Sequence, residues 1–133
     1  MTMSFEPVDL LQEAERFVLA APGEPTALIA SRCPACGRTA FPRAVCCPAC
    51  GAAPETVELR GPAVLDVRTA VLSPPPGALV LAPYDVGVAR FPDAGLCVIG
   101  LLAGPAEQGD AVDVVAHAYH EDRLTFAFRR HPE

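Results

Sequence analysis

The chain of 133 residues has no lysine and no tryptophan, so all ten of its basic side chains are arginines. Sixteen acidic residues outnumber them, which gives a formal net charge of −6. A protein that binds a phosphate backbone or an anionic membrane needs positive charge on its surface. The charge balance therefore argues against nucleic acid and anionic membranes as default partners.

Long hydrophobic runs are also absent from the sequence. No stretch approaches the roughly 20 consecutive apolar residues of a membrane-spanning helix. Glu6, Asp9, Glu13 and Glu15 stand where a signal peptide needs a basic start and an apolar run. We therefore expect a cytoplasmic protein, in which thiols stay reduced and cysteines bind metal before they form disulfides.

Proline and glycine are abundant, with 15 and 10 residues, and they favour turns and short elements over a helical bundle. One helix is predicted, from Pro7 to Ala20. Pro7 suits a first helical position, and Val8, Leu11 and Val18 form a narrow apolar stripe. This helix either caps its own domain or docks on a partner chain, and the sequence leaves both readings open.

The region after residue 57 predicts a small β-barrel. Apolar residues alternate from Ala63 to Val71, which places the odd-numbered side chains on one face. Leu96 to Ala103 is apolar throughout, as in a strand buried on both faces, with Cys97 in the core. Three more strands and one hairpin turn are expected at Tyr84–Phe91, Val112–Ala118, Leu124–Arg130 and Pro92–Gly95. Five short strands in about 75 residues suit a closed barrel.

The most specific signal is the motif Cys-Pro-Ala-Cys-Gly, which occurs twice, at Cys33–Gly37 and Cys47–Gly51. Two cysteines three apart can place both sulfurs on one ion, while proline stiffens the turn and glycine lets the chain leave it. Two such knuckles facing each other predict one tetrahedral structural zinc site. The expected ligands are Cys33, Cys36, Cys47 and Cys50. Iron stays an alternative, because sulfur ligation does not exclude it.

Cys46 stands beside Cys47 and could replace it, but the repeated motif favours Cys47 as the ligand. A four-cysteine zinc site has no open coordination position, so it stabilises a small ribbon and does not activate water. Arg32, Arg38 and Arg43 surround the two motifs. They either balance the excess negative charge of four thiolates on zinc or contact a phosphate, such as that of coenzyme A.

Catalytic groups do not form a recognisable set in the sequence. His117 lies on an expected strand and is interpreted as a solvated strand residue. The sequence has no Ser-His-Asp order, nucleophile elbow or phosphate loop. We therefore expect a chain that is not catalytic by itself.

The order of two knuckles, a proline loop and five strands resembles the DUF35 family of acyl-CoA-associated zinc-ribbon OB-fold proteins. The likeness rests on the N-terminal helix, the stretch Arg32–Arg43, the second knuckle, Gly61 before the first strand and Pro74–Gly77 after it. With this resemblance, a mainly β protein in three parts is expected. These parts are an N-terminal helix (1–24), a rubredoxin-like four-cysteine zinc ribbon (25–56) and a five-stranded OB-fold barrel (57–133).

The resemblance implies a non-catalytic accessory subunit in a hetero-oligomer. Its partner would be a larger CoA-dependent enzyme, either thiolase-like or an acyl-CoA hydratase or retro-aldolase. The loop residues Pro75, Pro76 and Gly77 would contact this partner or a ligand. From their place around the two motifs, Arg32, Arg38 and Arg43 are further candidates for such a contact. The chain departs from the family pattern at Ala78, where members often carry a bulky aromatic, and in the apolar extension Leu79–Leu81.

Two other functions stay open at this stage. A nucleic-acid-binding module is the main alternative, since OB barrels and zinc ribbons both serve there. Its stacking platforms would come from the aromatic residues Tyr84, Phe91, Tyr119, Phe126 and Phe128, of which three lie on predicted core faces. A stand-alone enzyme acting on acyl thioesters is the third function, and it lacks a visible acid–base pair.

Overall fold

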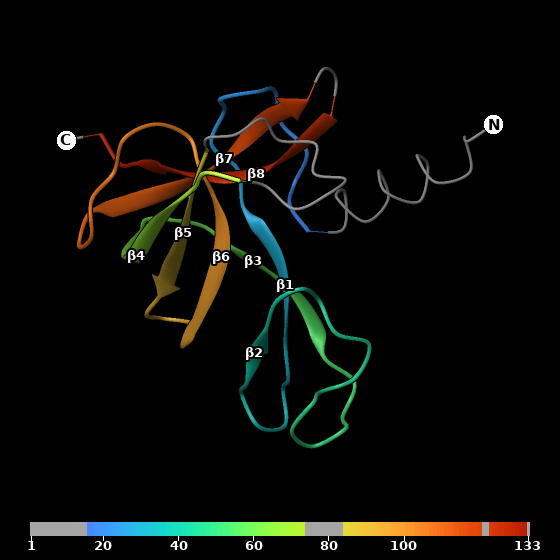
Figure 1. The fold of residues 1–133 in the computed structure, drawn as a ribbon. Coiled ribbons are helices and arrows are strands. Elements are labelled where there is room, and N and C mark those ends of the chain that lie inside the picture. Colours follow the sequence, from blue (N-terminus) through green and yellow to red (C-terminus); the bar gives the residue numbers. More distant parts are fainter. Residues whose placement is uncertain (1–15, 74–83, 121–122, 133) are drawn as a thin grey trace.

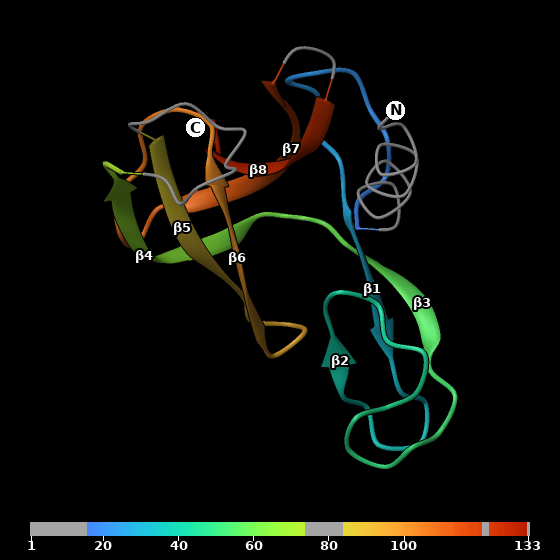
Figure 2. The same cartoon turned by 45° about the vertical axis from the view of Figure 1, so that its right-hand side comes forward.

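The computed structural model describes residues 16–73, 84–120 and 123–132, and within these ranges the chain forms eight β-strands and no helix. The described residues therefore include no helix with the length and apolarity needed to cross a membrane. Two sheets account for all eight strands: a small ribbon sheet and a closed barrel. The ribbon extends from one end of the barrel as a separate lobe (Figures 1 and 2).

The ribbon sheet consists of β1 (Leu28–Arg32), β2 (Thr39–Ala40) and β3 (Glu55–Leu59). β1 lies in the middle and pairs antiparallel with both neighbours. β3 pairs with β1 along its whole length, from Glu55 opposite Arg32 to Leu59 opposite Leu28. The two loops of this sheet, between β1 and β2 and between β2 and β3, carry the two cysteine motifs.

The barrel closes in the order β4-β5-β6-β8-β7, so the sequence prediction of a closed five-stranded barrel is confirmed. All neighbouring pairs are antiparallel except β6 and β8, which are parallel. This order is that of an OB-type barrel. The strand bounds are β4 (Ala63–Val71), β5 (Tyr84–Phe91), β6 (Leu96–Leu102), β7 (Ala111–His120) and β8 (Arg123–Arg130).

Three phenylalanines fill the centre of the barrel. The rings of Phe91 and Phe128 lie 6.3 Å apart between centroids, and those of Phe126 and Phe128 lie 5.8 Å apart. Gly100 on β6 makes room for them, because a Cβ there would lie 2.8 Å from ring carbons of both Phe126 and Phe128. The core thus depends on the fit between two large rings and one residue without a side chain.

The predicted N-terminal helix is wrong over the part that the structure describes, and residues 7–15 of it lie outside the described residues. Residues 16–20 are not helical, and Phe17 instead forms a β-bridge with Leu28. The amide of Val18 donates to the carbonyl of Ala27 at 3.0 Å, and Phe17 is completely buried. Pairing with the chain that leads into β1 replaces the helical hydrogen bonds there.

The prediction that Leu96 to Ala103 is buried on both faces is also wrong. β6 turns Leu96, Val98 and Leu102 inward, but Ile99 on the outer side is 70% exposed. Cys97, predicted to lie in the core, is exposed on the same outer side. A barrel wall has only one inner face, so an apolar strand that forms part of it leaves alternate side chains in solvent.

The expected alternation along β4 holds only to Leu65. A register shift lies between Leu65, which pairs with Ala89, and Val67, which pairs with Val88. Leu65 is completely buried, whereas Val67 is 54% exposed. A β-bulge adds one residue to the strand, and an odd shift moves every later side chain to the opposite face.

Backbone pairing holds the segment before β1 against the barrel. The amide of Thr26 donates to the carbonyl of Val114 at 2.8 Å, and the amide of Ala116 donates to that of Glu24 at 3.0 Å. This segment therefore continues the sheet beyond the edge of β7. A second contact comes from the ribbon, where the ring of Phe41 meets that of Phe126 edge-on at 5.6 Å. Together these contacts fix the ribbon on the barrel.

Candidate metal centre

The two cysteine motifs fold into two matching turns. In the first, the amide of Gly37 donates to the carbonyl of Cys33 at 2.7 Å, and in the second, the amide of Gly51 donates to that of Cys47 at 2.8 Å. Both glycines have positive φ values, 80° and 79°, in the left-handed region that glycine adopts without strain. The repeated sequence thus gives a repeated backbone, and the expected role of glycine in leaving each turn is confirmed.

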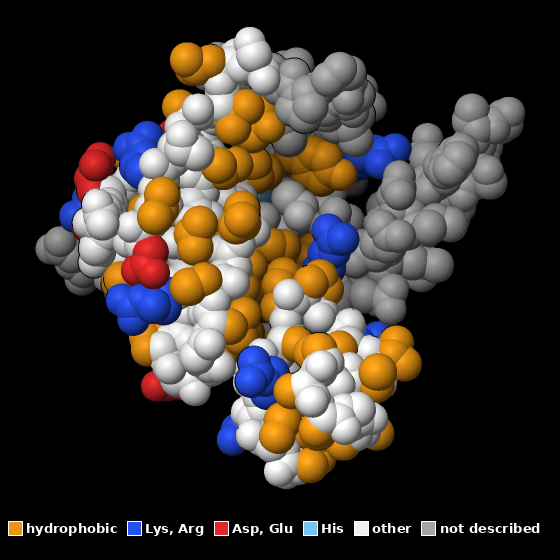
Figure 3. Space-filling view, turned by 60° about the horizontal axis from the view of Figure 1, so that its bottom comes forward, with side chains coloured by type: hydrophobic (Ala, Val, Ile, Leu, Met, Phe, Trp, Pro, Cys, Tyr) orange, Lys and Arg blue, Asp and Glu red, His pale blue; other side chains and the backbone are white. Residues whose placement is uncertain are grey.

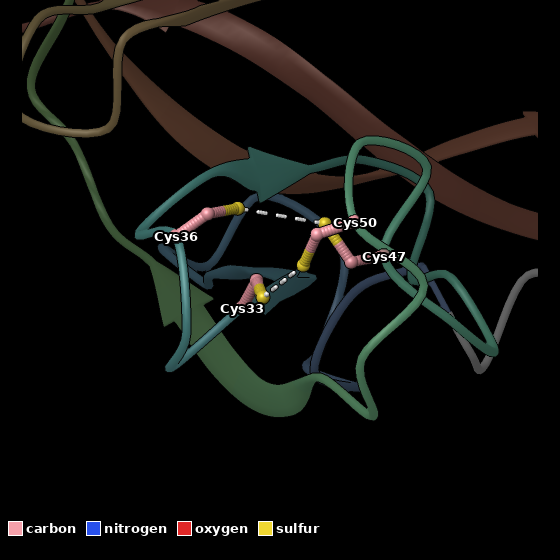
Figure 4. A group of neighbouring side chains, drawn as sticks. All are labelled: Cys33, Cys36, Cys47 and Cys50. Carbon is pink, nitrogen blue, oxygen red and sulfur yellow. Dashed lines mark hydrogen bonds between the residues drawn. The ribbon is translucent and has the colours of Figure 1, made fainter.

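The four cysteines of these turns bring their sulfurs together, all within 4.8 Å of one another. Cys33 Sγ lies 3.4 Å from Cys50 Sγ, and Cys36 Sγ lies 3.6 Å from Cys47 Sγ (Figure 4). Sulfurs bound tetrahedrally at 2.3 Å from zinc would lie about 3.8 Å apart. The donor set and its spacing therefore fit one metal ion bound by four thiolates.

The site is buried on one side and open on the other. Cys33 and Cys47, the first cysteine of each turn, are 1% and 3% exposed, while Cys36 and Cys50 are exposed. Cys46 is exposed and does not belong to the clustered group. The fold therefore separates adjacent cysteines, with Cys47 inside the cluster and Cys46 outside it.

Backbone amides stabilise thiolate at the first cysteine of each turn. Hydrogen bonds from the amides of Cys50 and Ala49 lower the pKa of Cys47 to about 6, and the Ala49 amide lies 3.4 Å from the sulfur. The amide of Cys36 likewise lowers the pKa of Cys33. Amide donors aimed at a sulfur favour its charged form, which is the form that binds metal.

Crowding of the sulfurs has the opposite effect on Cys50. The amide of Ala52 lowers the pKa of this thiol, but the neighbouring sulfurs of Cys33 and Cys47 raise it, and it reaches about 11. Four thiolates cannot all form at this distance without a cation between them. The arrangement is therefore suited to hold a divalent metal ion.

Arg32, Arg38 and Arg43 are all exposed on the ribbon. Arg38 lines a cavity of about 350 Å³ between the first turn and the tip of the β5–β6 hairpin, and Ala94 and Gly95 form its barrel side. The predicted hairpin turn at Pro92–Gly95 is confirmed. The loop residues Pro75, Pro76 and Gly77, and the apolar extension Leu79–Leu81, lie outside the described residues.

A second cavity of about 220 Å³ lies on the same junction, between the end of the ribbon sheet and the base of the hairpin. Leu59 and Arg60 line it from the ribbon side, and Phe91 and Pro92 from the barrel side. Figure 3 shows the hollow between the two lobes, with hydrophobic side chains along its walls. Sequence reasoning missed this junction, because residues from distant segments form it and no motif marks them.

His117 lies on β7 opposite Thr125 and is half-buried, and burial lowers the pKa of its imidazole. The fold thus favours neutral His117, whose contribution to stability is complete above the unfolded-state pKa of about 6.5 and is lost as the pH falls below it.

We expect His117→Gln to weaken the loss of stability between pH 8 and pH 5.5, measured by urea unfolding of both proteins. An identical pH dependence in wild type and variant would contradict this assignment.

A four-sulfur cluster on two knuckles, joined to a closed five-stranded barrel, defines a zinc-ribbon protein with an OB-like barrel. Residues 25–56 match the family model of the ChsH2 rubredoxin-like zinc ribbon domain. No curated protein matches the sequence.

The solved structures similar to the chain include the following two. The first is the Ltp2-ChsH2(DUF35) aldolase, with 27% identity and a TM-score of 0.64 over 78% of this chain and 84% of the matched one. The second is a protein of unknown function from the DUF35 family of Sulfolobus solfataricus. It has 20% identity and a TM-score of 0.54 over 79% of this chain and 76% of the other, a likeness of fold. The family match thus covers the ribbon, residues 25–56, and the two structures are similar to the chain in fold.

Proposed function

We propose that the chain is a zinc-binding accessory subunit of a larger CoA-dependent enzyme in the cytoplasm, in a hetero-oligomer. The partner would be thiolase-like or an acyl-CoA hydratase or retro-aldolase. The observation that carries the proposal is the likeness, over most of both chains, to a chain of the Ltp2-ChsH2(DUF35) aldolase. The proposed zinc ligands are Cys33, Cys36, Cys47 and Cys50.

Zinc is favoured over other metals by the donor set. Four cysteine thiolates in tetrahedral spacing are typical of structural zinc, and the matched ribbon family is of the zinc type. An ion with four protein ligands has no position for water or substrate. The proposed ion therefore stabilises the ribbon, and the catalytic groups of the assembly would come from the partner.

Contact with acyl-CoA is proposed for the ribbon side of the junction. The exposed Arg38 lines the cavity of about 350 Å³ beside the first turn, and its guanidinium could pair with a phosphate of coenzyme A. Arg32 and Arg43 are exposed on the same small ribbon and would add positive charge there. Pro75, Pro76 and Gly77 stay a proposed partner contact from sequence resemblance alone.

The nucleic-acid alternative loses three of its five candidate stacking platforms in this fold. Phe91, Phe126 and Phe128 are 5%, 7% and 0% exposed, because their rings fill the barrel core. Bases stack only on aromatic faces that reach the surface. Together with the net charge of −6, this arrangement disfavours single-stranded nucleic acid as the partner.

Co-expression with a CoA-dependent enzyme subunit that this chain captures from lysate of its native host would test the proposal. We expect the two chains to co-purify with one zinc ion per copy of this chain, and the enzyme to gain activity only in the complex. Light scattering with chromatography and elemental analysis would measure stoichiometry and metal. A chain that stays a monomer and never changes the activity of that enzyme would contradict the proposal.

A further inference from the structure

The outer wall of the barrel carries a contiguous set of aliphatic side chains on β4, β5 and β6. Val88 pairs across the sheet with Val67 on one side and Ile99 on the other, and Val86 pairs with Leu101 in the next row. Val67 and Ile99 are 54% and 70% exposed, and the other members are partly exposed. We call this set the aliphatic face: Val67, Val86, Val88, Ile99 and Leu101.

The bulge in β4 creates part of this face. With unbroken alternation, Val67 would point inward with Leu65, but the register shift between them turns Val67 outward beside Val88. Ile99 stands on the other side of Val88, so a row of three β-branched side chains crosses three strands. Contiguous exposed apolar side chains of this kind typically mark a surface that another molecule covers.

The charges next to the aliphatic face are already paired with each other. On the outer side, Arg90 Nε lies 3.2 Å from Asp66 Oδ1. Arg68 stands opposite Gly87, so it and its partner Asp85 lie on the other side of the sheet. This outer pair of Arg90 and Asp66 joins β4 to β5 and leaves that part of the outer wall electrically balanced. A surface complementary to it is therefore neutral and aliphatic, and a phosphate or an anionic headgroup gains little there.

The position of the face within the fold narrows the class of ligand further. In OB-type barrels, the wall formed by the second and third strands is where oligonucleotides and oligosaccharides bind. Here β5 and β6 are those strands, and they present aliphatic side chains in place of the aromatic rings that stack on bases or sugars. Both cavities described above lie at the ribbon junction, so this face suits a folded protein surface more than a small molecule.

We propose that the aliphatic face is the surface on which the partner enzyme subunit docks, through a neutral patch of its own aliphatic side chains. This inference rests on the proposed function and adds where the contact lies. Ile99 and Val67, the two most exposed members, would be buried at the centre of the interface. A carboxylate at either position would then be desolvated without a partner.

The test uses the zinc-loaded chain and the CoA-dependent enzyme subunit that co-purifies with it, with the dissociation constant measured by calorimetry. We expect Ile99→Glu and Val67→Glu each to weaken binding about tenfold or more. Val45→Glu is the matched control, because Val45 is 96% exposed on the ribbon and lies outside the aliphatic face. Its dissociation constant should stay within about twofold of wild type.

A footprint on the wild-type chain gives a second measurement that needs no substitution. Cys97 is exposed on the outer side of β6, two residues before Ile99, and Cys46 is exposed on the ribbon. Alkylation followed by mass spectrometry should show Cys97 slowed in the complex and Cys46 unchanged. Equal alkylation of Cys97 with and without the partner would overturn the inference.

The outcomes separate the two proposals. A wild-type chain that does not bind the enzyme subunit overturns both the proposed function and this docking surface. Binding that survives Ile99→Glu and Val67→Glu as well as it survives Val45→Glu overturns the docking surface alone. A homodimer of the wild-type chain that Ile99→Glu dissociates, seen by sedimentation, would assign the face to a second copy and overturn the choice of partner.

Discussion

Replacing Cys33 with serine is expected to remove the bound metal and to unfold the ribbon. Cys33 is 1% exposed, and its sulfur lies 3.4 Å from that of Cys50, so the change removes a donor from the buried side of the cluster. Apparent binding free energies of structural zinc reach roughly 10–16 kcal/mol and become folding free energy in small domains. Elemental analysis should find the zinc content reduced to a small fraction of one ion per chain.

Cys46→Ser is the control for this substitution, because Cys46 lies outside the sulfur cluster. The Cys46→Ser protein should keep one zinc ion per chain and the circular-dichroism spectrum of the wild type. The barrel supplies none of the four clustered cysteines, so its own unfolding transition should survive Cys33→Ser. A Cys33→Ser protein with full zinc content would disprove the assigned ligand set.

Replacing Phe128 with alanine is expected to destabilise the barrel by about 3–5 kcal/mol, the usual cost of removing a buried phenylalanine ring. Phe128 is completely buried and lies between Phe91 and Phe126. The cavity would not collapse easily, since Gly100 on the neighbouring strand β6 has no side chain to fill it. Urea unfolding of the zinc-saturated protein measures the change.

Ile99→Ala is the comparison for Phe128→Ala, because it also removes an apolar side chain. Ile99 lies on the outer side of the barrel wall, whereas Phe128 lies on the inner side. Because Ile99 is 70% exposed, we expect a loss of about 1 kcal/mol or less in the isolated chain. Free energies of unfolding of small domains are about 5–15 kcal/mol, so the two variants should be well resolved. Equal destabilisation by Phe128→Ala and Ile99→Ala would contradict the assignment of inner and outer faces.

Local signals in the sequence predicted the parts of the fold that depend on neighbouring residues. The two cysteine turns were recognisable because each is complete within five residues and is stabilised by its own hydrogen bonds. The bounds of β4 and β5, Ala63–Val71 and Tyr84–Phe91, agree with the predicted strands because turn-forming residues flank both.

Features set by distant contacts were not predictable. The bulge after Leu65 depends on pairing with β5, and the alternation of β4 itself gave no sign of it. Residues 16–20 end the stretch whose apolar stripe predicted a helix, but Phe17 is buried by pairing with Leu28 and by the barrel core. Propensity is a weak guide where tertiary pairing supplies competing hydrogen bonds. The exposure of Cys97 likewise follows from barrel closure and not from local composition.

The pairing of the segment before β1 with β7 has a consequence for synthesis on the ribosome. The sulfurs of Cys33 and Cys50 are only 17 residues apart in sequence, so the ribbon can bind its ion early. The contacts that hold the segment before β1 on the barrel need residues much later in the sequence. Arg129 NH1 donates to the carbonyl of Gly23 at 2.9 Å, and the two residues are 106 positions apart. We therefore expect the nascent chain to carry a finished ribbon, able to bind its ion, on an unfinished barrel until Arg129 has been translated.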